Sequence, residues 1–172
     1  MSVALGASDG VVVVGPLASG FEHGAASVVA GGPTRSASVR CGLAEVPDDA
    51  DVIVVHDAAR PLATVEMFES AIAAVRAGAD AAIPAVPVTD TLREIDGTVV
   101  DRSRLVAVQT PQAFKADALR RAHSGGPEAT DDAAVVESAG GRVVLVAGDR
   151  WNLKITEPSD LAVAEALLAA RS

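Results

Sequence analysis

The segment VIVVHDAARP, residues 52–61, starts as an apolar strand and ends in three ionisable side chains. Its first four residues are branched and aliphatic, which favours a strand buried in a sheet. His56, Asp57 and Arg60 follow at once, where a soluble domain seldom places charged groups unless they are used. In open α/β sheets, ligands bind at the carboxyl ends of the strands. The segment therefore predicts an α/β sheet with a ligand site at the end of this strand.

The rest of the chain alternates short β-branched runs with longer stretches rich in alanine and leucine. This alternation is typical of helices that cover a mainly parallel sheet. Pro84 and Pro87 weaken one strand pattern and place that strand near a sheet edge. Strands are expected over 11–14, 27–30, 51–56, 81–88 and 142–149; helices are expected over 36–46, over 64–77, from 130–132 to 139, and after Thr156 to about 170.

A β-hairpin is predicted at about residues 89–104, because Asp96-Gly97 lies between two alternating segments. Such a hairpin either forms an oligomerisation arm or lies on its own domain, and the pattern favours neither. Residues 1–172 contain no internal repeat or linker. They predict a single three-layer α/β domain with a mainly parallel sheet and a protruding hairpin arm.

The composition narrows the possible partners. The 172 residues are 49% hydrophobic, and their net charge of −9 argues against nucleic acid or an anionic membrane as the main partner. Phosphates could still bind through a locally basic pocket or a metal. The single cysteine, Cys41, excludes an intrachain disulfide and fits a reducing cytosol. Without a basic, signal-like N-terminus or a membrane-length apolar run, we expect a cytoplasmic protein.

Two positions at predicted element ends could carry chemistry. Asp57 could hold a divalent cation or a substrate hydroxyl, and Arg60 could bind a phosphate through two hydrogen bonds. The alternative is an ion pair that caps the following helix. Lys154, between Leu153 and Ile155, is either an ordinary surface lysine or a cation directed at a ligand.

Other candidates are weaker. Residues 31–38, GGPTRSAS, form a glycine-led loop that could bind a base edge or a phosphate, although the pattern favours a plain turn with a serine cap. Arg102 reads as a solvated charge, and residues 109–114, QTPQAF, read as a turn before a helix. His123 reads as solvent-facing, without a partner to make it a base. No nucleophile, base and orienting group form a triad here.

Taken in order, several motifs resemble one known family. They are GGPTRSASV, VHDAARP, PAVPVTDTL, QTPQAF, TDDAAVVE and NLKITEPSDL. The chain resembles the 2-C-methyl-D-erythritol 4-phosphate cytidylyltransferases of the non-mevalonate isoprenoid pathway from about residue 9 to its C-terminus. The ribitol-phosphate cytidylyltransferases have a similar layout and are the nearest alternative.

The resemblance implies a nucleotidyltransferase fold and transfer of CMP from CTP to methylerythritol phosphate, with Mg²⁺ and release of pyrophosphate. The acceptor phosphate attacks the α-phosphorus in line, so positioning and charge neutralisation matter more than acid–base chemistry. By resemblance, Asp57 holds the metal or acceptor hydroxyls, Arg60 binds the acceptor, and Lys154 neutralises phosphate charge near the reacting centre.

The remaining site residues are also implied by the resemblance. The family's hairpin arms interlock across a two-fold axis, so the chain is expected to form a homodimer in which Arg102 enters the partner's site. The nucleotide is assigned to Gly31, Gly32, Ser38 and His56, and the acceptor to Thr91, Arg102, Thr110 and Thr130. Pro33 stands where the family has an acidic residue, so the resemblance does not carry that cytidine contact over to this chain.

The chain departs from the family at its start. Nothing in MSVALGASDG matches the family's glycine-rich A-A-G-x-G-x-R loop or the P-K pair after it. The resemblance therefore implies that the chain is N-terminally truncated or begins at a late start. Losing one preorganised charge-stabilising group costs about 10²–10³ in rate. Two alternatives remain: a non-catalytic, dimeric binding subunit, and a cytidylyltransferase for ribitol 5-phosphate.

Overall fold

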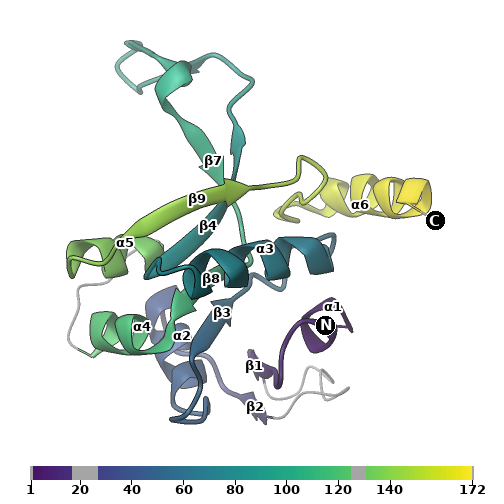
Figure 1. Ribbon diagram of the computed structural model, residues 1–172. Helices are drawn as coiled ribbons and strands as arrows, with labels where there is room; N and C mark the ends of the chain where they lie inside the picture. Colours follow the sequence, from purple (N-terminus) through teal and green to yellow (C-terminus); the bar gives the residue numbers. More distant parts are fainter. Residues whose placement is uncertain (1, 17–26, 125–130, 172) are drawn as a thin grey trace.

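The computed structural model describes residues 2–16, 27–124 and 131–171 (Figure 1). Its helices are α1 (Ser2–Gly6), α2 (Arg35–Leu43), α3 (Val65–Arg76), α4 (Ala116–His123), α5 (Asp132–Ser138) and α6 (Pro158–Arg171), with one 3₁₀ turn, η1 (Arg102–Arg104). Its strands are β1 (Val12–Val14), β2 (Ser27–Val29), β3 (Val52–Val55), β4 (Ala81–Pro87), β5 (Leu92–Arg93), β6 (Val99–Val100), β7 (Val106–Val108), β8 (Gln112–Lys115) and β9 (Val143–Ala147).

The main sheet has five strands arranged around β4. The strand order is β3-β8-β4-β7, and β9 also pairs with β4. At Ala85, β4 pairs with both β7 and β9, which therefore lie on opposite edges of it. At Ala81, β4 pairs with both β8 and β9. It follows that β7 and β8 lie along the same edge of β4, one after the other.

The helices cover both faces of this sheet. Ala81, Ile83 and Phe114 pack with residues of α4 and α5 in one buried cluster. Ala82 and Ala113, which alternate with them along the strands, pack against α3 in a second cluster. Figure 1 shows α3 crossing the sheet. Since side chains alternate between the faces of a strand, two clusters at adjacent positions mean two helical layers. The predicted three-layer α/β arrangement is confirmed.

The sheet is less parallel than the sequence predicted. β9 pairs with β4 in parallel, but β8 is antiparallel to both β3 and β4, and β7 is antiparallel to β4. The difference comes from β8, whose sequence QAFK reads as a turn because it contains no β-branched residue. Its first three residues are buried between the helical layers. Tertiary packing, rather than local propensity, makes this segment a strand.

The position of β4 also corrects the sequence analysis, which placed it near an edge because of its prolines. β4 has strand neighbours on both sides. The Pro84 carbonyl accepts a hydrogen bond of 2.7 Å from the Gln109 N–H, so Pro84 faces the edge occupied by β7 and β8. Its missing N–H points to the interval between these two strands, residues 109–111, where no ladder bond is required.

The predicted hairpin is present. β5 and β6 pair antiparallel, and the turn between them contains Gly97 with a φ of +92°. Figure 1 shows this arm projecting away from the sheet and its helices. Val99 on the arm is 57% exposed. The arm therefore does not fold back onto its own sheet.

The N-terminal part forms a separate small sheet. β1 and β2 pair in parallel, and the five-stranded sheet contains neither of them. They lead into α2, whose N-cap is Thr34, with a hydroxyl that accepts from the Ala37 N–H at 3.1 Å. The cap is thus a threonine, where the sequence suggested a serine. In the described parts of the chain, no helix is long and apolar enough to cross a membrane.

Candidate functional site at the end of the central strands

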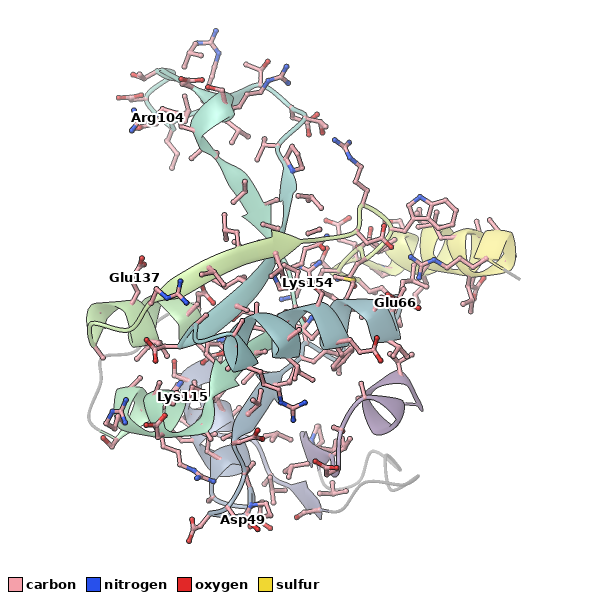
Figure 2. The ribbon with its side chains drawn as sticks, in the orientation of Figure 1. Asp49, Glu66, Arg104, Lys115, Glu137 and Lys154 are labelled. Carbon is pink, nitrogen blue, oxygen red and sulfur yellow. The ribbon has the colours of Figure 1, made fainter. Side chains whose placement is uncertain are left out.

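Segments that are far apart in the sequence meet at the end of β3. Lys154 Nζ lies 2.9 Å from Asp57 Oδ2 and forms an ion pair with it. The Ile155 N–H donates to the Ala59 carbonyl at 2.8 Å, which fixes the Lys154 segment beside the loop after β3. Figure 2 shows Lys154 near the connection between β9 and α6. The structure thus joins Asp57 and Lys154, whose chemical roles stay a prediction.

Arg60 belongs to the same group of residues. Its Nη1 donates to the Asn152 carbonyl at 2.8 Å, and its Nε–H is buried without a hydrogen-bond partner among the described residues. Burial lowers the pKa of the guanidinium, while Asp57 opposes that change, and an arginine stays protonated in either case. A buried donor without a partner is costly. Arg60 therefore brings a positive charge to the end of β3, while its Nε–H is covered by the chain and has no partner among the described residues.

His56 and Thr110 hold the start of this loop. The Asp57 N–H donates to Thr110 Oγ1 at 3.0 Å, and the same oxygen lies 2.9 Å from His56 Nδ1. His56 Nε2 lies 3.2 Å from the Arg60 carbonyl. Burial lowers the pKa of His56, although its contact with the Arg60 carbonyl and the nearby Asp57 charge oppose this. Burial therefore favours the neutral imidazole.

Two buried amide side chains fix the floor of the site. Asn152, fully buried, donates through Nδ2 to the Thr110 carbonyl at 2.9 Å. Gln109 donates through Nε2 to the Asp149 carbonyl at 2.9 Å and accepts from the Asp149 N–H at 3.1 Å. The sequence analysis missed both residues. Their only signal was their position inside the QTPQAF and NLKIT motifs, because amides without charge or periodicity do not stand out in one sequence.

The glycine-led loop lies before α2 and is tightly closed. The Gly32 N–H donates to Ser38 Oγ at 3.1 Å. A Cβ at Gly32 would lie 2.4 Å from the Ala37 Cβ, so only glycine fits there. A Cβ at Gly31 would lie 3.0 Å from Ser38 Oγ. These contacts show a capped turn, and a nucleotide contact by Gly31, Gly32 and Ser38 stays a prediction.

The arm residues lie apart from the Asp57 group within the described chain. Arg102 donates to the Thr89 carbonyl on its own arm. It lines a cavity of about 440 Å³ at the base of the arm, together with Thr89 and Arg150. Thr91 is exposed. Thr130 lies outside the described residues. Within the described residues of one chain, the structure therefore does not bring Thr91 and Arg102 to the Asp57 group.

His123 contradicts the sequence analysis, which placed it in solvent. Its side chain is only 2% exposed, and Nε2 lies 3.0 Å from Asp132 Oδ1. Asp132 Oδ2 pairs with Arg35 Nη2 at 2.7 Å. Burial raises the pKa of Asp132, but hydrogen bonding to His123 and the charge of Arg35 outweigh it and hold that pKa below its usual value. The ends of α4, α5 and α2 create this contact, which sequence spacing alone does not show.

The described residues contain no group of three or more His, Cys, Asp or Glu side chains that could hold a metal. Asp57 is a single carboxylate whose side chain is 22% exposed, with one oxygen paired to Lys154. A metal held only by protein ligands is therefore not supported here. Mg²⁺ commonly binds through one or two carboxylates together with substrate phosphates, and Asp57 fits that arrangement.

An α/β sheet that gathers a carboxylate, two cations and buried amides at its strand ends is typical of proteins that bind phosphorylated substrates. The similar solved structures place this α/β fold in the nucleotidyltransferase class. The sequence profile of the 2-C-methyl-D-erythritol 4-phosphate cytidylyltransferase family matches residues 13–170. The chain belongs to this family.

Similar proteins carry the same description. A 2-C-methyl-D-erythritol 4-phosphate cytidylyltransferase of Streptomyces avermitilis is 46% identical over 156 residues, covering 84% of this chain and 62% of that protein. One of Rubrobacter xylanophilus is 50% identical over 149 residues, covering 81% and 64%. The crystal structure of the Thermus thermophilus protein of the same name superposes with a TM-score of 0.83 at 38% identity, covering 96% of this chain and 86% of that one. The chain thus spans less than two thirds of the length of the first two relatives.

Proposed function

We propose that this chain transfers CMP from CTP to 2-C-methyl-D-erythritol 4-phosphate and releases pyrophosphate. The observation that carries this proposal is the convergence of Asp57, Arg60 and Lys154 at the end of β3. These residues come from two segments about a hundred positions apart and match motifs of the family. The similar proteins named above, which bear the corresponding enzyme name, support the choice of acceptor.

The reaction balances without a covalent enzyme intermediate. A phosphate oxygen of the acceptor attacks the α-phosphorus of CTP, the bond from that phosphorus to the β-phosphate bridge breaks, and pyrophosphate leaves. Such a step depends on alignment of the reactants and on neutralisation of their phosphate charges. Lys154, whose side chain is 46% exposed, and the guanidinium of Arg60 supply positive charge. Asp57 orients Lys154 and can bind acceptor hydroxyls or a metal.

Mg²⁺ belongs to this proposal as a partner of the nucleotide. Asp57 would be its protein ligand, because its second carboxylate oxygen is not engaged by Lys154. The remaining ligands would come from the phosphates and water, which is the usual mode for this ion. When bound, Mg²⁺ supplies charge neutralisation at the phosphates. The protein's own part is to place Asp57 by anchoring its N–H to Thr110.

The homodimer is also part of the proposal. Val99 on the arm is 57% exposed, and Leu105 and Val106, which follow the arm, are 38% and 44% exposed. Apolar side chains gathered on a projecting arm are typical of an interface. Interlocked arms would bring Thr91 and Arg102 of one subunit to the Asp57 group of the other. Thr130, Gly31, Gly32 and Ser38 are proposed as further substrate contacts on the strength of their motifs.

The experiment is a pyrophosphate-release assay on the 172-residue chain with CTP, Mg²⁺ and either methylerythritol phosphate or ribitol 5-phosphate. We expect turnover with methylerythritol phosphate. Lys154→Gln should lower kcat/KM at least about 100-fold, since a charge-stabilising group is lost. The chain has one other lysine, Lys115, which is 56% exposed, and Figure 2 shows it apart from Lys154. Lys115→Gln should therefore leave turnover unchanged. A preference for ribitol 5-phosphate, or no acceptor-dependent release, would contradict the proposal.

A further inference from the structure

His56 closes the loop that carries Asp57 and Arg60. The proposed reaction assigns His56 no chemical step. His56, the first residue after β3, reaches across the loop with both ring nitrogens. Nε2 lies 3.2 Å from the Arg60 carbonyl, and Nδ1 lies 2.9 Å from Thr110 Oγ1. The ring also contacts Phe68 of α3, with centroids 5.3 Å apart. The loop is thereby connected to a helix and to the turn before β8.

The hydrogen-bond partners determine where the imidazole proton lies. A carbonyl oxygen only accepts, so Nε2 must carry the hydrogen that it donates to the Arg60 carbonyl. Nδ1 of the neutral ring is then an acceptor. Thr110 Oγ1 already accepts from the Asp57 N–H, and its own proton is available to Nδ1. With this one tautomer, the Nε2–H of His56, the Asp57 N–H and the Thr110 hydroxyl each have an acceptor.

We propose that His56 is a positioning residue, which as the Nε2–H tautomer bridges Thr110 to the Arg60 carbonyl and so sets the Asp57 carboxylate and the Arg60 guanidinium for the acceptor. Both ring nitrogens have partners within the chain, so we expect His56 to act through the loop, in place of the nucleotide contact that the resemblance implied. The charged groups that face it are Asp57 and Arg60 of its own loop; α3 contributes Phe68 and the turn before β8 contributes Thr110. The acceptor named in this inference rests on the proposed function.

Three substitutions of His56 distinguish the effect of its two hydrogen bonds from the effect of its ring packing. His56→Phe keeps a ring beside Phe68 but loses both bonds. His56→Asn keeps an acceptor near the place of Nδ1, and His56→Gln keeps a donor near the place of Nε2. Binding of methylerythritol phosphate is measured by calorimetry. We expect His56→Phe to raise Kd roughly 10- to 100-fold, and His56→Asn and His56→Gln each to recover part of that loss.

The matched control is His123→Asn, which removes a buried histidine bonded to Asp132 and should leave Kd unchanged. Two readouts need no substrate. Long-range ¹H–¹⁵N spectra should show the hydrogen of His56 on Nε2, and the Arg60 and Ile155 amides should exchange faster in His56→Phe but not in His123→Asn.

The results also distinguish this inference from the proposed function. If the chain does not turn over but the tautomer and the exchange rates are as expected, the positioning role stands and the proposed function fails. A hydrogen on Nδ1, or a His56→Phe variant with unchanged Kd and exchange rates, would overturn the inference. So would equal losses in all three variants, because ring packing alone would then explain them.

Discussion

At the scale of single residues, the loop before α2 tolerates almost no added volume. A Cβ on Gly32 would lie 2.4 Å from the Ala37 Cβ and 2.9 Å from the Ala37 backbone carbon. Since the second contact is with backbone, the loop must move to accept a methyl group. We expect Gly32→Ala to lower the free energy of unfolding by about 1–3 kcal/mol, as overpacking does.

Gly15→Ala is the matched control for this change. A Cβ there meets nothing within 4 Å. Replacing such a glycine is neutral, or stabilises by up to about 1 kcal/mol because the unfolded chain loses freedom. Urea unfolding of both variants measures the difference. Equal stability of Gly32→Ala and Gly15→Ala would show that the loop adapts freely.

Asp132 makes the stability of the chain depend on pH. Its pKa is held below its usual value, because hydrogen bonding to His123 and the charge of Arg35 outweigh the effect of burial. In the pH range between the folded and the unfolded pKa, the unfolded chain binds more protons, so stability falls as the pH falls. The contribution is complete above an ordinary aspartate pKa of about 4 and is lost through the lower, folded pKa.

Asp132→Asn tests this directly by urea unfolding from pH 7 downward. The variant should be less stable than the wild type at pH 7, and the difference should shrink as the pH falls below about 4. Asp117→Asn is the exposed counterpart: the pair with Arg121 also lowers the pKa of Asp117, but solvent screens this pair, so the variant should change stability little at any pH. A stability difference for Asp132→Asn that is the same at every pH would contradict the assigned ion pair.

At the scale of elements, the sequence predicted most strands and helices but not their neighbours. β3, α3 and β9 have patterns that agree with their surroundings, so local reasoning found them. β8 lacks β-branched residues and becomes a strand because its residues are buried between α3 and the α4–α5 layer. β4 contains prolines yet is central, because the ladder is interrupted where Pro84 has no N–H to offer.

The site residues also divide into those that the sequence predicted and those that it did not. Asp57 and Arg60 stood out because they follow an apolar strand, and Lys154 because it is a lone cation between apolar residues. His123 was misplaced and Asn152 was missed, since their partners Asp132 and Thr110 come from other segments. Contacts of this kind arise only when the elements pack. Charged residues could be identified from the sequence by their type. Residues whose role depends on a hydrogen-bond partner in another segment could not.

The arm provides a prediction at this scale. Val99 on β6 and Val163 on α6 are both exposed, at 57% and 52%. If the arm forms the subunit interface, Val99→Asp places a charge in an apolar contact and should shift the sedimentation coefficient toward that of a monomer. Val163→Asp, the same substitution outside the arm, should leave it unchanged. Dissociation by Val163→Asp and not by Val99→Asp would move the interface from the arm to α6.

At the scale of the whole molecule, the charges conflict with the proposed ligands. The chain carries a net charge of −9, which repels phosphates at long range, while Arg60 and Lys154 attract them at short range. Screening at physiological salt limits the repulsion to about 8 Å. Anion binding must therefore depend on the local geometry of the strand ends. Residues that position the loop after β3 should therefore affect anion affinity as strongly as its charged groups do.

The small β1–β2 sheet should open by local unfolding more often than the five-stranded sheet. β1 and β2 form a separate pair with only half-buried residues, whereas β4 lies between strands and under two helical layers. Local opening requires less free energy where fewer apolar contacts are lost.

Gly15 and Gly148 are a matched pair of the same residue type: Gly15 N–H donates to the Val29 carbonyl at 3.0 Å, and Gly148 N–H to the Ala85 carbonyl at 2.9 Å. In native-state hydrogen exchange, Gly15 should exchange at least about tenfold faster than Gly148. Equal protection of the two amides would mean that the small sheet opens only when the whole chain unfolds, and that it is part of the same cooperative unit as β4.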